Sequence, residues 1–107
     1  MNSIRYSRRG GAAIGSTSAS WPLGKIEIST DSVTVSALGK AKTLCVAEVL
    51  RVEPLGLLAA AEGRGVRIFF RGQRWEEFVD FYSMTGQRDV LLELRSAGFN
   101  VVEKSAS

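Results

Sequence analysis

The side chains best suited to recognition lie in one stretch, VRIFFRGQRWEEFVDFYSM, which spans residues 66–84. An extended strand would place Arg67, Phe69 and Arg71 on one face, and Arg74 would follow across a turn. An arginine beside an exposed aromatic ring is typical of the residues that dominate protein interfaces, and it could also stack on single-stranded nucleic acid. The competing interpretation is that Phe69 packs under a neighbouring loop while the arginines are ordinary solvated charges.

Residues for catalysis or metal binding are scarce. The sequence has no histidine, so the usual general base is missing, and one cysteine without histidine cannot complete a tetrahedral zinc site. Glu76 and Glu77 are adjacent, but neighbours on a strand point to opposite faces. Cys45 lies in the apolar stretch TLCVAEVL, which predicts a small buried core residue. We therefore predict that the protein is not an enzyme and that it binds no cofactor or metal.

The positive charge is concentrated at the start of the chain. Of the 14 Lys and Arg residues, Arg5, Arg8 and Arg9 lie in the first 18 residues, which contain no Asp or Glu. The rest of the chain has 11 basic and 11 acidic residues and is therefore formally neutral. Residues 1–18 are also rich in Gly, Ser and Ala, which predicts a flexible tail. Such a tail could contact an anionic membrane surface weakly. Nucleic acid is a less favoured partner, because the basic residues do not belong to the folded body.

The length of 107 residues suits one domain, which we expect to span residues 19–107. The longest apolar run, LGLLAAA, is far shorter than the roughly 20 residues that span a bilayer. A lone cysteine fits a reducing compartment. We expect a cytoplasmic protein, with peripheral contact at the inner membrane surface as the alternative.

Alternating apolar residues predict several short strands. Ile26 and Ile28 alternate with polar residues, and Val33 and Val35 do the same after the polar turn TDS, so the two segments read as a hairpin. TLCVAEV is a third strand or a strand that runs into a helical turn, and LRVEPL is a fourth. GLLAAAEGRG reads as a loop with at most one helical turn, because glycines flank it.

The last hairpin and the last helix have the clearest signals. VRIFFR and RWEEFVDFYS are strands that a two-residue turn at Gly72-Gln73 would join. That register puts Glu77 on the core face, a conflict that a bulge or an edge position open to solvent would resolve. A helix follows, with Thr85 as N-cap and Gly98 at its end. Its apolar stripe consists of Val90, Leu91, Leu94 and Ala97. FNVVE then reads as a short extended segment.

Antiparallel hairpins followed by one amphipathic helix are an α+β arrangement in which the helix covers one face of a bent sheet. On the stretches WPLGKIEISTDSVTVSA, VAEVLRVEPL and GQRWEEFVDFYSMTGQRDVLLELRSAGF, the sequence resembles the pleckstrin-homology-like (PH-like) superfamily, especially its small bacterial members. The resemblance covers about residues 20–102. It implies a strongly bent antiparallel sheet, or partly open barrel, of about seven strands that is closed by one C-terminal α-helix.

The resemblance also implies a non-enzymatic interaction module. Members that bind phosphoinositides carry Lys and Arg clusters at the first hairpin, whereas the turn STDSV here contains only Asp31 as a charge, so phosphoinositide is disfavoured. We expect a protein or peptide partner, bound at a sheet edge or in the groove beside the C-terminal helix. The candidate partner-binding residues are Arg67, Phe69, Arg71 and Arg74. Self-association through the same edge, and membrane or nucleic-acid contact through Arg5, Arg8 and Arg9, are the alternatives.

Overall fold

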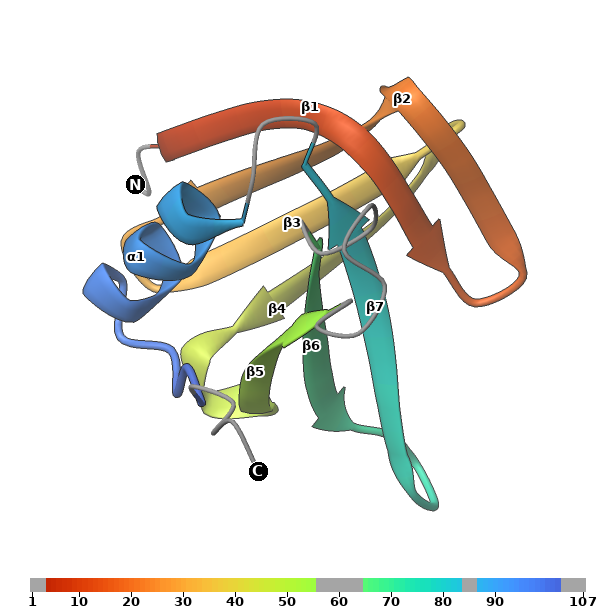
Figure 1. Ribbon diagram of the computed structural model, residues 1–107. Coiled ribbons are helices and arrows are strands. Elements are labelled where there is room, and N and C mark those ends of the chain that lie inside the picture. The colour runs from red at the N-terminus through yellow and green to blue at the C-terminus, as the bar shows by residue number, and fades with distance from the viewer. Residues whose placement is uncertain (1–3, 56–64, 84–86, 103–107) are drawn as a thin grey trace.

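The computed structural model describes residues 4–55, 65–83 and 87–102. Within these residues, seven strands form one antiparallel sheet and one α-helix follows it (Figure 1). The strands are β1 (Ile4–Ile14), β2 (Thr17–Ser29), β3 (Ser32–Ala37), β4 (Lys40–Cys45), β5 (Val49–Leu55), β6 (Gly65–Arg71) and β7 (Glu76–Tyr82). A 3₁₀ turn, η1 (Val46–Glu48), joins β4 to β5, and the helix is α1 (Arg88–Ser96). The expected α+β class, a seven-stranded antiparallel sheet with a C-terminal helix, is confirmed.

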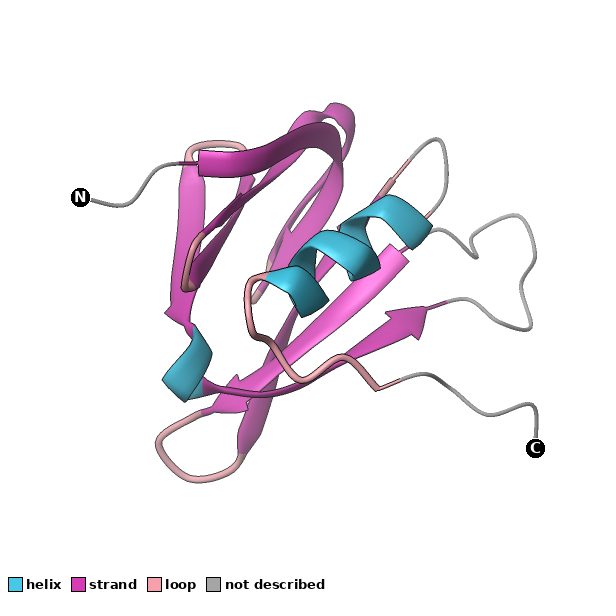
Figure 2. Ribbon diagram, turned by 90° about the vertical axis from the view of Figure 1, so that its left-hand side faces the viewer, coloured by secondary structure: helices cyan, strands magenta, loops and turns pink. Residues whose placement is uncertain are grey.

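The sheet is strongly bent but not closed. Its strand order is β4-β3-β2-β1-β7-β6-β5, so β1 pairs with β7 and joins a four-stranded half to a three-stranded half. Figure 2 shows α1 lying in front of the sheet, with strands of both halves curving round it. The apolar stripe of α1 completes the core, since Val90, Leu94 and Ala97 are buried there. The strands contribute the rest of the core: Ala12, Ile14, Ile26, Ile28, Val33, Val35, Ala37, Leu44, Val52, Val66, Ile68, Phe70, Val79 and Phe81, with Phe99 after the helix.

The prediction of a flexible tail over residues 1–18 is wrong for the part that the structure describes. Residues 4–14 form β1, which pairs with β2 on one side and with β7 on the other. The folded domain therefore includes residues 4–18, which the expected boundary at residue 19 left out. Gly10 and Gly11, which suggested mobility, are needed for packing, because β1 lies very close to both of its neighbours. A Cβ on Gly11 would lie 3.0 Å from the carbonyl oxygen of Ala19 on β2, and one on Gly10 would overlap the carbonyl oxygen of Tyr82 on β7.

Most of the predicted elements are present. Thr30 and Asp31 form the turn between β2 and β3, and β4 runs into the 3₁₀ turn η1, which was one of the two alternatives for TLCVAEV. Gly98 has φ +103° immediately beyond the helix, as expected for a C-terminal cap. The expected loop over residues 56–65 lies outside the described residues except for Gly65, which begins β6, and the expected N-cap at Thr85 also lies outside them.

The turn between β6 and β7 is longer than predicted. Arg71 pairs with Glu76, so the connection comprises residues 72–75 and not two residues, and the Gly72 N–H donates to the Trp75 carbonyl at 3.0 Å. Phe70 consequently faces Glu77 across an unbroken register. Glu77 is exposed at a place where β7 has no partner on its β1 side among the described residues, because β1–β7 pairing ends at Ile14 and Val79. Of the two proposed resolutions, the edge position open to solvent is confirmed.

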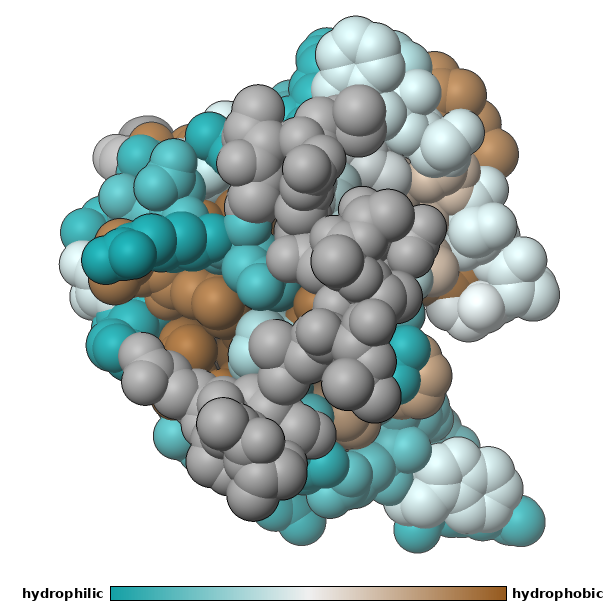
Figure 3. Space-filling model, viewed as in Figure 1, coloured by the Kyte–Doolittle hydropathy of each residue, from teal (hydrophilic) through white to brown (hydrophobic). Residues whose placement is uncertain are grey.

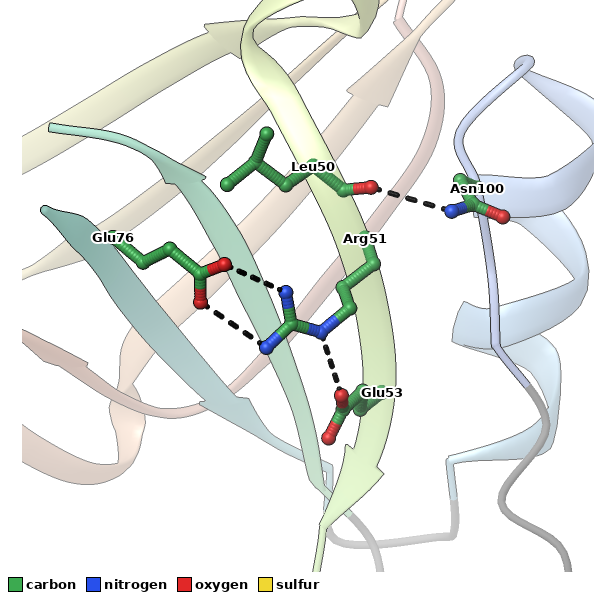
Figure 4. Close-up of polar contacts among 5 residues, drawn as sticks. All are labelled: Leu50, Arg51, Glu53, Glu76 and Asn100. Atoms are coloured by element: carbon green, nitrogen blue, oxygen red, sulfur yellow. Dashed lines mark hydrogen bonds and ion pairs between the residues drawn. The ribbon is translucent and has the colours of Figure 1, made fainter.

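The two edges of the sheet differ. β4 has no strand beyond it within the described chain. The edge of β5 is partly covered by the segment after α1: the Val52 N–H donates to the Asn100 carbonyl, and the Val102 N–H donates to the Val52 carbonyl, both at 2.8 Å. Val101 forms an isolated parallel bridge with Val52, and the Asn100 side chain donates to the Leu50 carbonyl (Figure 4). Residues 100–102 therefore already bind the backbone groups at the middle of the β5 edge.

Candidate interaction surface on the last hairpin

The predicted recognition residues Arg67 and Phe69 belong to a cluster on the face of β5, β6 and β7 that points away from the core. We call it the outer-face cluster, and its residues are Arg51, Glu53, Arg67, Phe69, Glu76, Phe78, Asp80 and Tyr82. The Phe69 and Phe78 rings are tilted by 60° with centroids 5.8 Å apart. The Arg51 guanidinium lies 3.9 Å from the Phe69 centroid, and that of Arg67 lies 4.0 Å from the Phe78 centroid. Two stacked Arg–Phe pairs therefore lie side by side.

Arg51 is engaged by two carboxylates, one on its own strand and one on β7. Its Nε donates to Glu53 at 2.8 Å, and its two terminal nitrogens donate to the two oxygens of Glu76 at 3.1 and 3.2 Å (Figure 4). The bidentate geometry is the strongest form of this contact. Hydrogen bonds from Arg51 hold the pKa of Glu76 below its usual range. Arg51 therefore links β5 to β7 across β6.

Arg67 is engaged in the same way by Asp80. Its Nε donates to one carboxylate oxygen at 2.8 Å and its Nη2 to the other at 3.0 Å, while the Tyr82 hydroxyl donates to Asp80 at 3.1 Å. Asp80 is buried although it lies on the outer face. Burial, followed by the negative charge of Asp80, raises the pKa of Tyr82. The carboxylates of the cluster thus accept hydrogen bonds that hold neighbouring strands together. The Arg67 guanidinium is already bound to Asp80.

A hollow opens beside this cluster, where β1 ends and β7 continues. We call it the hairpin notch: an open pocket of about 450 Å³ that lies between the β1–β2 and β6–β7 hairpins. Figure 3 shows it at the right-hand margin of the molecule, with the β6–β7 hairpin below it. The residues that line it are Ala13, Ile14, Gly15, Lys42, Phe70, Trp75, Glu76, Glu77, Phe78 and Val79. Its floor is apolar, because Ile14, Phe70 and Val79 belong to the core.

Two large aromatic side chains are exposed at the notch. Trp75 is 69% exposed and Phe78 is 46% exposed, although both line the pocket. The two-residue turn expected from the sequence would have put Trp75 opposite Phe70 on the core face. The longer loop leaves Trp75 outside the core, whereas Phe78 would lie on the outer face in either register. The misfit of Glu77 did not signal the longer loop, because Glu77 lies opposite a core residue in either register.

Arg71 and Arg74, the other two predicted partner-binding residues, lie at the tip of this hairpin. Both are exposed, and neither makes an ion pair with any residue that the structure describes. Arg71 ends β6, and Arg74 precedes Trp75 in the loop. Of the four predicted residues, Arg67 and Phe69 therefore already contact other side chains of the sheet. Arg71 and Arg74 are exposed at the hairpin tip.

The three arginines near the N-terminus are located on β1. Arg5 donates to the Ser96 hydroxyl at 3.0 Å, and Arg8 donates to the Ser83 hydroxyl at 3.2 Å and forms an ion pair with Asp89 at 3.5 Å. Both side chains thus link β1 to α1 or to the residue after β7, and Arg9 is exposed. The prediction that these arginines belong to a mobile tail is wrong, because β1 is an inner strand of the sheet.

Cys45 is exposed and not buried as predicted, because it ends β4 with its side chain on the face opposite Leu44.

Among residues 4–55, 65–83 and 87–102, no group of three or more His, Cys, Asp or Glu side chains is arranged to hold a metal ion. No helix in these ranges is long and apolar enough to cross a membrane.

Comparisons with known proteins give a likeness of fold. No protein-family model matches the chain. No curated protein matches it either. Among solved structures, it is similar to the C-terminal domain of an unknown protein from Leishmania infantum, with a TM-score of 0.66 and 7% sequence identity. The match covers 90% of this chain and 84% of that one. At this identity the likeness concerns the arrangement of strands and helix alone.

Proposed function

We propose that this chain is a PH-like, non-enzymatic interaction module that binds a protein or peptide at the hairpin notch. The observation that carries the proposal is the position of Trp75 and Phe78, two exposed aromatic residues that both line a pocket with an apolar floor. Tryptophan next to arginine is the composition that dominates binding free energy at protein interfaces. In the sheet, strands β1 to β4 lie in sequence order on one side of the β1–β7 pair and β7 to β5 on the other, and the C-terminal helix packs against the core. This arrangement supports the PH-like assignment.

A strand edge at the notch provides a way to bind an extended segment. Glu76, Glu77 and Phe78 pair with β6, while their other edge has no partner among the described residues. A peptide laid there would continue the sheet beside β7 and place alternate side chains over the notch. The groove beside the helix is less suitable for strand addition, because residues 100–102 already pair with β5.

The test is selection of a random-peptide display library on the purified wild-type domain, with the recovered peptides then measured against variants. We expect Trp75→Ala and Phe78→Ala to weaken binding at least about tenfold, which corresponds to the loss of a hot-spot side chain. Trp21→Ala is the matched control, since Trp21 is 54% exposed on β2 and does not line the notch. Peptides that bind Trp75→Ala as tightly as wild type, with the fold intact by circular dichroism, would rule the notch out.

A further inference from the structure

The edge strand β4 has no partner on its outer side among the described residues, and it lacks the features that usually keep such edges apart. It pairs with β3 along all six of its residues without a register shift, so no bulge interrupts it. It contains no proline, and its side chains on the face away from the core are those of Ala41, Thr43 and Cys45, which are small and uncharged. Both lysines of β4 lie on the core-facing side, where the Lys42 Nζ is 4.8 Å from the Phe70 ring centroid. A second strand can therefore approach this edge.

Two hydrogen bonds at the end of β4 show which of its backbone groups point outward. The Val46 N–H donates to the Asp31 carbonyl at 2.9 Å, on the β3 side. Successive residues of an antiparallel strand direct their backbone groups to opposite sides, so the Cys45 N–H points away from β3. There it donates to the Glu48 carboxylate at 2.8 Å. By the same alternation, the N–H and carbonyl groups of Ala41 and Thr43 point away from β3 and are available to a new strand.

We infer that β4 of a second copy of this chain pairs with β4, antiparallel and related by a two-fold axis that passes through Thr43. In this register the Thr43 N–H of each copy donates to the Thr43 carbonyl of the other. The Ala41 N–H of each copy donates to the Cys45 carbonyl of the other, and the Cys45 N–H stays with Glu48. The two sheets then form one continuous sheet. The inference goes beyond the proposed function and does not depend on it.

Side-chain contacts favour this register over the neighbouring one. A two-fold axis through Lys42 would place the two Lys42 side chains directly opposite each other, and like charges in that position destabilise a strand pair. The axis through Thr43 instead places Lys42 opposite Leu44 of the second copy. It also brings together two Thr43 side chains, whose hydroxyls each lie 2.8 Å from that of Thr34 in the same copy. Paired threonines are favourable neighbours across strands.

The charges at the two ends of β4 favour a second copy as the occupant of this edge. Lys40 begins the strand and Glu48 follows its end, both are exposed, and neither makes an ion pair with a residue that the structure describes. The axis through Thr43 places Lys40 opposite Val46 of the second copy, close in sequence to Glu48 of that copy. Each end of the edge therefore meets the opposite charge, once on either side of the axis. Exposed ion pairs contribute little free energy, so these charges set orientation more than affinity.

The experiment measures the dissociation constant of the dimer by analytical ultracentrifugation of the purified chain over a range of concentrations. We expect the wild type to dimerise below about 0.5 mM, and Thr43→Pro to weaken the dimer at least about tenfold, because proline has no N–H to donate. Proline is tolerated where the N–H of an edge strand faces solvent. Thr43→Lys keeps the N–H but places two cations at the axis, and it should weaken the dimer by a similar factor. Thr34→Ala is the matched control: it removes the same hydroxyl contact from the inner strand β3 and should change the dissociation constant by about twofold or less.

A cysteine cross-link tests the register. The axis through Thr43 places Ala41 opposite Cys45 of the second copy, and Cα atoms in such a pair are about 5.5 Å apart, within the range that a disulfide spans. Ala41→Cys should therefore form a covalent dimer on mild oxidation, measured on a non-reducing gel. The wild type, in which Cys45 is the one cysteine, should form at least about tenfold less in the same time. Arg9→Cys, an exposed change on the inner strand β1, is the control and should behave like the wild type.

The outcomes separate this inference from the proposed function. A wild type that stays monomeric up to about 0.5 mM would overturn the dimer and leave peptide binding at the notch standing. A dimer that Thr43→Pro and Thr43→Lys weaken no more than Thr34→Ala does would place the interface elsewhere and overturn the inference. A dimer that is lost in Trp75→Ala would assign self-association to the notch, with the same result. A chain that dimerises but forms no cross-link in Ala41→Cys would overturn the axis through Thr43.

Discussion

Arg67 and Asp80 are paired on the adjacent strands β6 and β7, and Arg67 donates two hydrogen bonds to Asp80. Both side chains lie on the face of the sheet that points away from the core. Asp80 is buried while Arg67 is half-buried. Arg67→Met leaves that carboxylate with the Tyr82 hydroxyl as its remaining partner among the described side chains. We expect the free energy of unfolding to fall by about 2–3 kcal/mol, measured by urea denaturation.

The matched control for this change is Arg71→Met on the same face of β6. Arg71 is exposed and makes no ion pair within the described chain, so we expect a change within about 0.5 kcal/mol. Equal effects of the two substitutions would mean that the Arg67–Asp80 contact adds nothing to stability.

Phe69 and Phe78 should behave as a coupled pair in folding. Each ring contacts the other and carries an arginine on one face. A double-mutant cycle with Phe69→Leu and Phe78→Leu should give a coupling of about 0.5–1.5 kcal/mol. If the two rings are coupled, Phe69→Ala would lower the stability of the fold as well as remove any contact of Phe69 with a partner. Additive single effects would show that the two rings act independently.

Deletion of residues 2–18 should abolish cooperative unfolding. The deletion removes β1, the strand that joins the two halves of the sheet, together with the core side chains of Ala12 and Ile14. We expect a protein without a sharp thermal transition by circular dichroism. Arg9→Gln provides the control, because Arg9 is exposed on the same strand and its change should leave the transition in place. A truncated protein that melts as sharply as the full chain would show that β1 is dispensable.

The two tyrosines make the domain sensitive to alkaline pH. Burial is the main cause that raises the pKa of both Tyr6 and Tyr82 in the folded state. A raised pKa gives stability that is fully present below the ordinary tyrosine pKa of about 10, and that is lost as pH rises through the folded value. The urea midpoint should therefore decline above about pH 10.

Each Tyr→Phe variant should flatten this decline, but the two should differ at pH 7. Tyr82→Phe removes the hydrogen bond to Asp80 and should cost about 1 kcal/mol. The Tyr6 hydroxyl is buried without a hydrogen-bond partner among the described residues, so Tyr6→Phe should leave stability unchanged or raise it. A loss of more than about 0.5 kcal/mol in Tyr6→Phe would contradict this assignment.

The elements that the sequence predicted well have strong local signals. Ile26 to Ala37 alternate cleanly, and Val90, Leu94 and Ala97 repeat at the helical period, so both patterns identify a buried face without knowledge of the partner. β1 lacked such a signal. Its Gly10 and Gly11 are explained by the close approach of β2 and Tyr82, a contact between segments far apart in sequence that local composition cannot reveal.

The candidate site was predicted in part, for the same reason. Arg71 and Arg74 were proposed because arginine beside an aromatic side chain is typical of protein interfaces, and the structure leaves both exposed. The exposed position of Trp75 was missed because turn length fixes the strand register, and one glycine is compatible with both a two-residue and a four-residue connection. Lys42 was not considered, since its approach to the Phe70 ring on β6 depends on the bend of the whole sheet.

The contacts of Asn100 and Val102 with Val52 set a limit on assembly through the sheet. A fibril needs two available edges on every subunit, so that each copy accepts one neighbour and offers itself to the next. In this fold, residues 100–102 block the middle of β5, so β4 is the outer edge strand that stays open within the described chain. Pairing of β4 with β4 of a second copy would therefore stop at two subunits, unless the short free stretch of β7 at Glu76–Phe78 also took part.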